Sequence, residues 1–210
     1  MSAPVEIVTL PLGPVRANAY LLALAGQVVV VDPGDAGEEL GAALAERGWR
    51  LAAIWLTHAH FDHVGGVAGL LRSAGPAPVH MHQADEPLLE GAAASAARFG
   101  LAIEPPPLGF TPLVHGAELE SGGVRARVLH TPGHAPGHVA FHLEGQGVVL
   151  SGDALFKGSV GRTDLPFGDH DQLLASIRRE LLSLPPSTVV LPGHGDPTTV
   201  GAEAAGNPFL

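Results

Sequence analysis

The segment Thr57–His63 holds three histidines and an aspartate within six residues, and it constrains the fold and the chemistry more than any other part of the chain. It follows an apolar run and precedes a helix led by two glycines. Imidazole nitrogens and carboxylate oxygens bind borderline or hard divalent ions. A single ion cannot easily take four such groups from so short a loop. We therefore predict two ions, with His58 and His60 on one and Asp62 and His63 on the other.

A two-metal site needs further ligands, and the sequence supplies them at three later positions: His134, Asp153 and His194. Each follows a glycine and an apolar or strand-like segment, so each is expected where a strand gives way to a loop. Functional side chains favour such loops because a rigid scaffold orients them while solvent can reach them. These residues are predicted to complete both coordination spheres.

These motifs resemble those of the metallo-β-lactamase superfamily and, within it, the glyoxalase II-like branch of small hydrolases. The likeness covers nearly the whole chain and also includes the segments Asn18–Leu22, Val31–Gly34, Gly193–Thr199 and Asn207–Leu210. Five motifs in family order are a specific signal, whereas a lone His-x-His is a weak one. The resemblance assigns His58, His60 and His134 to the first metal, Asp62, His63 and His194 to the second, and Asp153 to both as a bridge.

The resemblance implies an α/β protein, a four-layer αββα sandwich of the metallo-β-lactamase type, with residues 1–210 forming a single domain. Hydrophobic periodicity predicts strands at Val5–Leu10, Ala19–Ala25, Gln27–Val31, Leu51–Leu56, Val79–Met81, Val124–Leu129, Val139–Leu143, Val148–Leu150 and Thr188–Leu191. It predicts helices at Ala36–Arg47, Val64–Ala74, Gln83–Gly91, Ala92–Phe99 and Asp169–Leu182. The first three strands are expected to be antiparallel, because the Ala25–Gln27 connection fits only a hairpin. A C-terminal helical domain like that of glyoxalase II enzymes is not expected after His194.

Composition narrows the partners of the protein. A chain of 210 residues with 46% hydrophobic residues can bury a substantial core. Its net charge of −10, with only 11 Lys and Arg, argues against nucleic acid as a partner. The absence of cysteine excludes a thiolate nucleophile. It also excludes the β-lactamase-type metal sites that use a cysteine ligand. A small-molecule substrate remains the expected partner, and the oligomeric state is left open.

The beginning of the chain lacks a basic region followed by an apolar stretch, so no secretory signal is expected. The longest apolar stretch, Ala19–Val31, is interrupted by Gly26 and Gln27 and is too short to span a bilayer. We therefore expect a cytoplasmic protein that does not enter the membrane.

The expected reaction is hydrolysis of a thioester, such as an acylated glutathione or a related thiol. Two divalent ions can lower the pKa of a bridging water from 15.7 to about 7, and the resulting hydroxide would attack the carbonyl carbon. A thiol with a pKa of about 8.5 can leave with little help from an acid. Asp62 can also carry a proton, while Thr57 and Asp32 can orient ligand imidazoles. Zinc is favoured, with iron or manganese as alternatives.

Two basic residues beyond Asp153 are candidates for binding the substrate. Arg162 lies where glyoxalase II relatives place a glutathione-contacting residue, and it would bind a carboxylate of an anionic thioester. Lys157, the only lysine, is the weaker candidate. Those relatives also place a tyrosine two residues after the last histidine ligand, where this chain has Asp196. The identity of the thiol therefore stays open.

Three alternatives to thioester hydrolysis are compatible with this set of motifs. A persulfide dioxygenase would use a single iron to activate oxygen, and a lactone hydrolase would need a tyrosine near the metals, where Tyr20 is the only candidate. A catalytically silent module would have lost ligands, and none is missing. Among the other histidines, His80 and His82 could mimic a metal pair, but we interpret them as polar residues of a short strand. We interpret His138 as a hydrogen-bonding residue.

Overall fold

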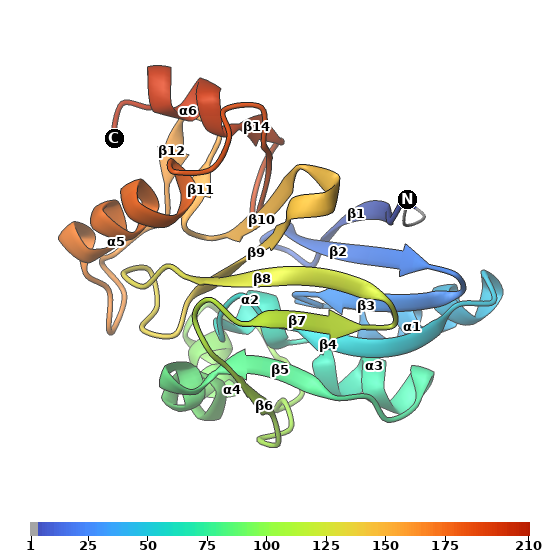
Figure 1. Ribbon diagram of the computed structural model, residues 1–210. Coiled ribbons are helices and arrows are strands. Elements are labelled where there is room, and N and C mark those ends of the chain that lie inside the picture. Colours follow the sequence, from blue (N-terminus) through green and yellow to red (C-terminus); the bar gives the residue numbers. More distant parts are fainter. Residues whose placement is uncertain (1–3) are drawn as a thin grey trace.

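The computed structural model describes residues 4–210 and consists of two sheets with helices on their outer faces (Figure 1). The first sheet has the order β1-β2-β3-β4-β5-β6. Its first three strands are antiparallel, as predicted, and the remaining neighbours are parallel. The strands are β1 (Glu6–Leu12), β2 (Ala17–Leu24), β3 (Gln27–Val31), β4 (Arg50–Trp55), β5 (Val79–His82) and β6 (Thr111–Leu113).

The second sheet has the order β14-β13-β10-β9-β8-β7 and is antiparallel except for the parallel pair β10 and β13. Its strands are β7 (Glu118–Ser121), β8 (Val124–His130), β9 (Val139–Leu143), β10 (Val148–Gly152), β13 (Val189–Pro192) and β14 (Thr198–Thr199). A small hairpin of β11 (Leu155–Phe156) and β12 (Ser159–Val160) leaves the end of β10.

The helices form the outer layers of the sandwich. They are α1 (Gly37–Glu46), α2 (Phe61–Val64), α3 (Val67–Ala74), α4 (Glu86–Arg98), α5 (His170–Ser176) and α6 (Val200–Gly206). Short 3-10 turns lie at Gln83–Asp85 and Glu144–Gln146, and a π-helical turn at Ile177–Leu181 extends α5. Asp169 and Thr199 cap α5 and α6 by accepting backbone N–H bonds, which satisfies donors that the first turn of a helix leaves free.

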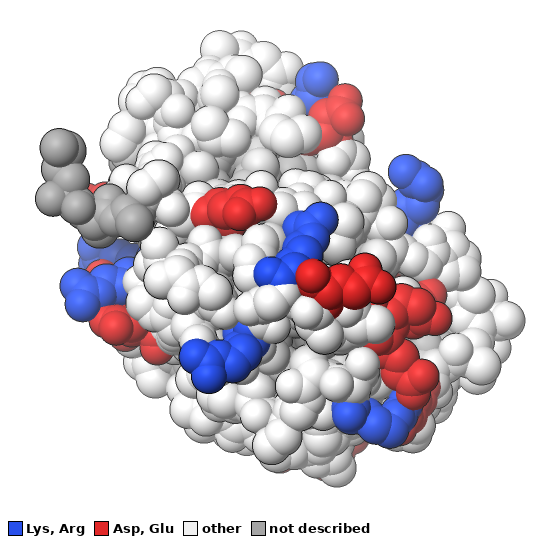
Figure 2. All heavy atoms as spheres, turned by 90° about the vertical axis from the view of Figure 1, so that its right-hand side faces the viewer, with Lys and Arg blue, Asp and Glu red and all other residues white. Residues whose placement is uncertain are grey.

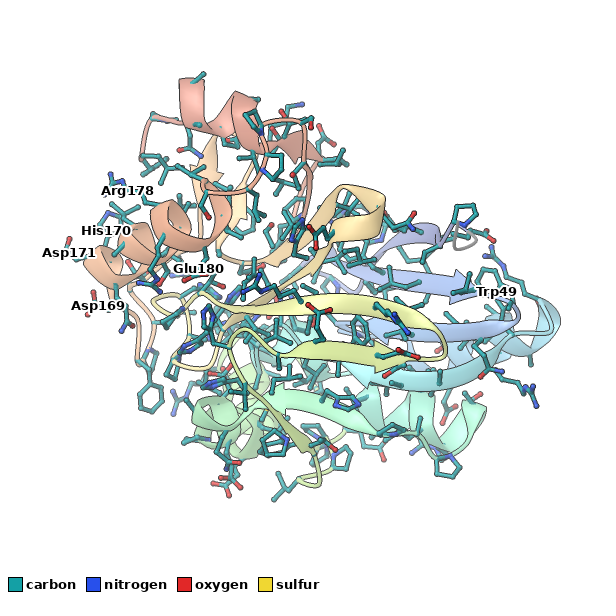
Figure 3. All side chains as sticks on the ribbon, viewed as in Figure 1. Trp49, Asp169, His170, Asp171, Arg178 and Glu180 are labelled. Atoms are coloured by element: carbon teal, nitrogen blue, oxygen red, sulfur yellow. The ribbon has the colours of Figure 1, made fainter. Side chains whose placement is uncertain are left out.

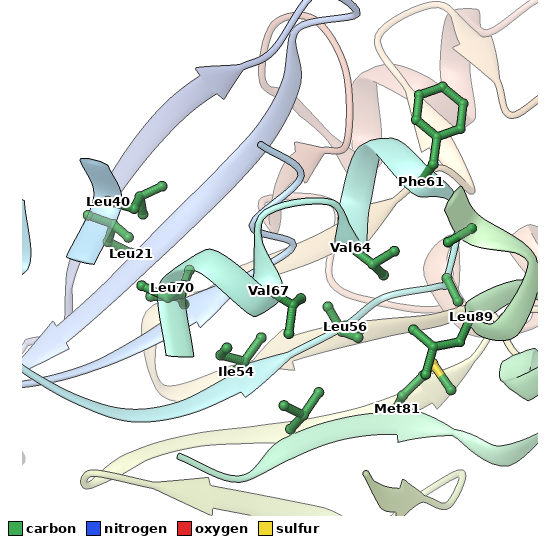
Figure 4. Packing of buried hydrophobic residues seen from close by; sticks show 14 of the residues in the cluster. Leu21, Leu40, Ile54, Leu56, Phe61, Val64, Val67, Leu70, Met81 and Leu89 are labelled. Atoms are coloured by element: carbon green, nitrogen blue, oxygen red, sulfur yellow. The ribbon is translucent and has the colours of Figure 1, made fainter. Parts of the chain in front are cut away.

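Alternating side chains of the central strands enter different cores, because successive residues of a strand point to opposite faces. In β3, for example, Val28 and Val30 belong to the core under α1, α3 and α4, whereas Val29 and Val31 pack between the two sheets. Figure 4 shows part of the first core, with Leu40, Leu70 and Leu89 among its labelled residues. In β10, Leu150 packs between the sheets, whereas Val149 packs against α5 and α6. Three cores between four layers follow, and the predicted αββα sandwich is confirmed.

Several predicted boundaries were wrong for identifiable reasons. The helices predicted at 83–91 and 92–99 are one helix, α4, because burial of Leu89, Ala92 and Ala96 outweighs the cost of about 1 kcal/mol for glycine at position 91. The helix predicted at 64–74 begins only at Val67, as α3, and the preceding short helix α2 was not predicted. The strands β6, β7, β11, β12 and β14 and the helix α6 were not predicted, because they are two to seven residues long and most lack an apolar alternation.

No helix among residues 4–210 is long and apolar enough to cross a membrane. Residues 1–3, which belong to the segment where no secretory signal was expected, lie outside the described residues.

Candidate metal centre

Four loops at strand ends, together with the short helix α2, bring the seven predicted ligands to one site. The first loop follows β4 and runs into α2, the second joins β8 to β9, and the other two follow β10 and β13. Because β10 and β13 are parallel neighbours, their carboxyl ends meet at the same edge of the sheet. The predicted ligands are His58 and His60 in the first loop, Asp62 and His63 in α2, His134 in the second loop, and Asp153 and His194 in the other two.

The first group consists of His58, His60 and His134, whose ligand nitrogens all lie within 4.8 Å of one another. Nε2 of His134 lies 3.2 Å from Nε2 of His58 and 2.9 Å from Nδ1 of His60. The other ring nitrogen of His134 donates to the carbonyl oxygen of Arg162 at 2.7 Å. A neutral imidazole has one N–H, so Nε2 of His134 presents a lone pair to the group.

Thr57 and Asp32 orient His58 in the same sense. The Thr57 hydroxyl donates to Oδ2 of Asp32 at 2.6 Å and lies 3.0 Å from Nδ1 of His58. Since its only proton goes to Asp32, Thr57 accepts the Nδ1 proton of His58. Nε2 of His58 therefore also presents a lone pair to the first group.

Burial keeps these imidazoles neutral. Burial, together with the neighbouring histidines, lowers the pKa of His58 far below its ordinary value and that of His60 to about 3. Burial also lowers the pKa of His134. Neutral nitrogens that converge in this way are suited to a cation and are poorly suited to one another.

The second group consists of Asp62, His63 and His194. Nε2 of His194 lies 3.3 Å from Oδ2 of Asp62, and Nε2 of His63 lies 3.8 Å from the same oxygen. Nδ1 of His63 donates to Oδ2 of Asp32 at 3.0 Å. Burial opposes protonation of His63, but Asp153, Asp62 and Asp32 raise its pKa to about 10. Burial also opposes ionisation of Asp62, yet His63 and His194 lower its pKa.

Asp153 lies between the two groups. Its Oδ2 is 3.6 Å from Nε2 of His134 and 3.5 Å from Nε2 of His194, and its Oδ1 is 3.4 Å from Nε2 of His63. Three buried side-chain atoms have no hydrogen-bond partner among residues 4–210: Nδ1 of His80, outside the centre, and Nε2 of His63 and Oδ1 of Asp153, within it. Leaving such an atom unsatisfied costs about 1–3 kcal/mol. The orphaned atoms and the two groups together suit two divalent cations.

A third combination, Asp32 with His58 and His63, also brings ligand atoms together. Both carboxylate oxygens of Asp32 are already used, because they accept from the Thr57 amide at 2.8 Å, the Thr57 hydroxyl and His63. Asp32 therefore acts through hydrogen bonds that aim the ring nitrogens, as the sequence predicted for it and for Thr57.

Asp85 and His138 connect the loops behind the ligands. Asp85 is fully buried and accepts from the amides of Ala59, at 3.0 Å, and Gly137, at 2.5 Å. Nε2 of His138 accepts from the amide of Asp153 at 3.0 Å, and its Nδ1 lies 2.8 Å from the Thr131 hydroxyl. The hydrogen-bonding role predicted for His138 is confirmed.

Asp85 was not among the residues predicted from the sequence. Burial raises the pKa of its carboxyl to about 6, although its two backbone N–H donors lower it. Only its position after a short strand could have drawn attention to it, and that signal is weak because aspartate is common at helix starts.

Glycines allow the loops to approach the ligands closely. A Cβ at position 193 would lie 2.0 Å from Oδ1 of Asp153 and 2.9 Å from Cε1 of His63. A Cβ at position 161 would lie 1.8 Å from the carbonyl oxygen of Asp153. Glycine before His194 is therefore required by contact with the ligands themselves.

The two predicted substrate contacts differ in position. Arg162 lines the cavity of about 360 Å³ beside the centre and forms two hydrogen bonds with Asp164, at 2.8 and 2.7 Å. Lys157 is exposed, does not line this cavity and lies 3.5 Å from Asp196. Arg162 thus lies at the cavity, and its guanidinium group is already paired with the carboxylate of Asp164.

The remaining histidines lie outside the centre. His82 stacks on His130 with ring centroids 4.2 Å apart, and its Nδ1 accepts from the Ala84 amide. No group of three metal-binding atoms among residues 4–210 includes His80 or His82. His170 is exposed at the outer end of α5 (Figure 3).

Comparison with known proteins decides the family. A profile of the metallo-beta-lactamase superfamily matches residues 12–194. The chain belongs to this superfamily. It is 41% identical to "Probable metallo-hydrolase YqgX" of Bacillus subtilis, over 96% of this chain and 95% of that protein. It is 38% identical to "Hydroxyacylglutathione hydrolase GloC" of Haemophilus influenzae, over 86% of each protein.

A solved structure supports the same assignment. The chain resembles TTHA1623, crystallised in a di-iron-bound form, with 52% identity, a TM-score of 0.89 and coverage of 98% of this chain and all of that one. The resemblance and the fold expected from the sequence motifs are confirmed. A superfamily member with this cluster of histidines and aspartates suits two metal ions, whose identity the cluster itself does not fix.

Proposed function

We propose that this protein is a metal-dependent hydrolase that cleaves thioesters at a two-metal centre. The ligands would be His58, His60 and His134 for one ion and Asp62, His63 and His194 for the other, with Asp153 shared. The observation that carries this proposal is the pair of orphaned buried atoms, His63 Nε2 and Asp153 Oδ1, between two groups of converging ligands. We favour zinc, and the di-iron form of TTHA1623 keeps iron as an alternative.

Two bound divalent ions would supply an activated water and polarise a carbonyl group. The chain contributes a fixed set of neutral histidine nitrogens and an ionised Asp62 at the wall of the cavity. Asp62 is our candidate to carry a proton during the reaction, although its lowered pKa makes it a weak base. The hydrogen bonds that Asp32 accepts from Thr57 and His63 hold the imidazoles in their orientation.

The residues around the cavity favour a substrate whose leaving group needs no acid. Besides the predicted ligands, the polar side chains that line it in the described part of the chain are Arg162 and Ser95. Neither is a good proton donor at neutral pH. A thiol, with a pKa of about 8.5, can leave as the thiolate. The similarity to GloC agrees with this choice, and Arg162 is the candidate to contact the thiol portion.

A thiol-release assay on metal-free protein reconstituted separately with zinc, iron or manganese tests the proposal. We expect thioester hydrolysis that depends on metal, from a panel that includes D-lactoylglutathione together with thioesters of neutral thiols. Hydrolysis should disappear in Asp153→Ala. Absence of metal-dependent hydrolysis over the whole panel would overturn the proposal.

Oxidation of a persulfide at a single iron is the second candidate, because iron binds histidine and carboxylate ligands as well. The same protein samples separate the two reactions. Oxygen uptake with one iron per chain would favour oxidation, whereas two metals per chain and no oxygen uptake would favour hydrolysis.

A further inference from the structure

We propose that an apolar groove beside the metal centre binds the acyl chain of the substrate, so that the enzyme prefers thioesters of longer, apolar acids. This inference rests on the proposed thioester hydrolysis and adds the class of acyl group. It is carried by the shape of the groove, by two exposed phenylalanines and by a strained backbone position.

The groove continues the cavity of the metal centre. It has a volume of about 470 Å³ and lies between α4 and the loop of residues 165–167. Five residues line both spaces: His60, Phe61, Ser95, Phe99 and Leu165. A substrate carbonyl at the centre could therefore extend a chain directly into the groove. Ligand sites of this size are typically lined by apolar side chains, and this wall is mostly apolar.

Phe61 and Phe99 mark the junction of the two spaces. Phe61 lies between the predicted ligands His60 and Asp62, and its ring centroid is 5.4 Å from that of Phe99. Phe99 is 54% exposed although it is a large apolar side chain. A chain that covered Phe99 would remove this apolar surface from water, which is favourable.

Phe167 lies in the loop across the groove from α4. Both the exposure of its side chain and its backbone conformation are energetically unfavourable. Its side chain is 60% exposed, and its backbone has a φ of 70°, in the left-handed region that bulky residues rarely adopt. Such strain is often found at functional sites. A glycine would fit this backbone better, so the phenylalanine ring is not explained by the fold of the loop.

The scarcity of charged side chains around the groove is consistent with binding of an apolar acyl chain. Arg98 is the only charged side chain that lines it in the described chain. Arg162 lines the cavity of the centre, where it can contact the more polar thiol portion. The two parts of a thioester would then occupy different walls, with the acyl chain in the groove.

A series of glutathione thioesters with acetyl, butanoyl, hexanoyl and octanoyl groups tests the proposal. We expect kcat/KM to rise by about threefold to fourfold per added methylene until the groove is filled, the factor for burying a CH₂ group. In Phe167→Gly this dependence should flatten, with little change for the acetyl substrate. The melting temperature should not fall, because glycine relieves the strained φ.

Phe209→Ser is the matched control, because Phe209 is also an exposed phenylalanine but lines neither space. It should keep the full dependence on chain length. Phe99→Ser is a second groove variant and should lose part of it. An equal loss on short and long substrates in Phe167→Gly, or a flat profile in the unaltered protein, would overturn the acyl-groove assignment.

Binding of S-alkylglutathiones, measured by calorimetry, separates this inference from the proposed function. These thioethers cannot be hydrolysed, so they report the groove even if no thioester is cleaved. Affinity that rises with alkyl length and falls in Phe167→Gly supports the groove. Affinity that is independent of alkyl length overturns it. If the unaltered protein self-associates and Phe167→Gly does not, the groove is an interface between copies of the chain, and the acyl-groove assignment is also overturned.

Discussion

At the scale of single residues, protonation distinguishes the two halves of the centre. The first group is held neutral by burial, with a pKa of about 3 for His60. In the second group, three carboxylates raise the pKa of His63 to about 10. The first group is therefore ready for a cation at neutral pH, whereas the second must first lose a proton.

Binding of the second metal ion should consequently release the proton of His63, whereas the first group binds its ion without losing one. The three carboxylates that raise the pKa of His63 to about 10 favour its protonated form at neutral pH, whereas a cation binds only the neutral ring. Affinity at the second group should rise about tenfold per pH unit between pH 7 and 9. Zinc titration in weakly buffered solution with a pH indicator should show release of at least one proton with the second equivalent. Release with the first equivalent only would contradict the assignment.

Gly193 tests the close approach of the backbone to the ligands. An added Cβ would lie 2.0 Å from Oδ1 of Asp153, so Gly193→Ala must displace the shared carboxylate. We expect metal affinity to fall at least tenfold, as for other disturbed supports of metal ligands. A competition assay with a coloured chelator measures this. Gly145→Ala is the control, since a Cβ there has no neighbour within 4 Å, and equal affinities in the two variants would refute the steric argument.

The candidate ligands could be predicted because their spacing encodes coordination chemistry directly. His58 and His60, for example, stand two residues apart in one loop. Asp85 could not be predicted, because its role depends on two backbone amides that are distant in sequence and meet only in the folded chain. The pairing of Arg162 with Asp164 was likewise not evident from residue type alone.

At the scale of elements, a chain of hydrogen bonds joins three ligand-bearing loops. Asp85 binds the amide of Ala59 in the first loop and that of Gly137 in the second. The next residue, His138, accepts from the amide of Asp153 in the third. The separation of the loops is therefore fixed by groups that do not themselves need to touch a metal.

Asp85→Asn should weaken metal binding while the fold persists. The amide keeps the size of the carboxylate but offers one acceptor where two N–H groups must be satisfied. We expect metal affinity to fall about 10- to 100-fold, the range for altered supporting residues, and the cobalt(II) absorption spectrum to change. Glu203→Gln is the matched control, because Glu203 is a buried carboxylate that binds the Gly158 amide away from the ligands. A lowered melting temperature with unchanged affinity and spectrum would show a purely structural role.

The prediction of elements from sequence depended on how much apolar surface each one buries. β3 and β10 were predicted because they contain runs of apolar residues, and nearly all of their residues are buried in the structure. β7 was missed because it lies at the edge of its sheet, with an alternation of exposed and partly buried residues that contains a single leucine. α6 was missed because glycine and alanine make up most of its length, and only Val200 and Glu203 are buried.

At the scale of the whole molecule, the core between the sheets joins the two halves. Tyr20, Val29 and Trp55 of the first sheet meet Val128 and Phe141 of the second, and the rings of Trp55 and Phe141 lie 5.2 Å apart. The predicted metal ligands also come from both halves. We therefore expect the single domain proposed from the sequence to unfold as one unit.

Calorimetry of the metal-free protein tests that expectation. A single transition should appear, with equal calorimetric and van't Hoff enthalpies, because a two-state transition requires this equality. Two resolved transitions in the metal-free protein would show that the halves fold separately.

The surface charge is consistent with a small-molecule substrate. The net charge is −10, and on the face shown in Figure 2 the basic side chains lie singly among acidic and uncharged residues. Nucleic-acid binding depends on clustered positive charge, and this face does not offer it. Arg162, one of the two residues expected to contact the substrate, lines the cavity beside the centre instead.

The central claim is that seven side chains hold two metal ions, and anomalous diffraction from crystals of the metal-loaded protein tests it most directly. We predict two anomalous peaks about 3.5–4 Å apart, one among His58, His60 and His134 and one among Asp62, His63 and His194, with Asp153 contacting both. A single peak at full metal loading, or peaks away from these residues, would contradict the two-metal centre.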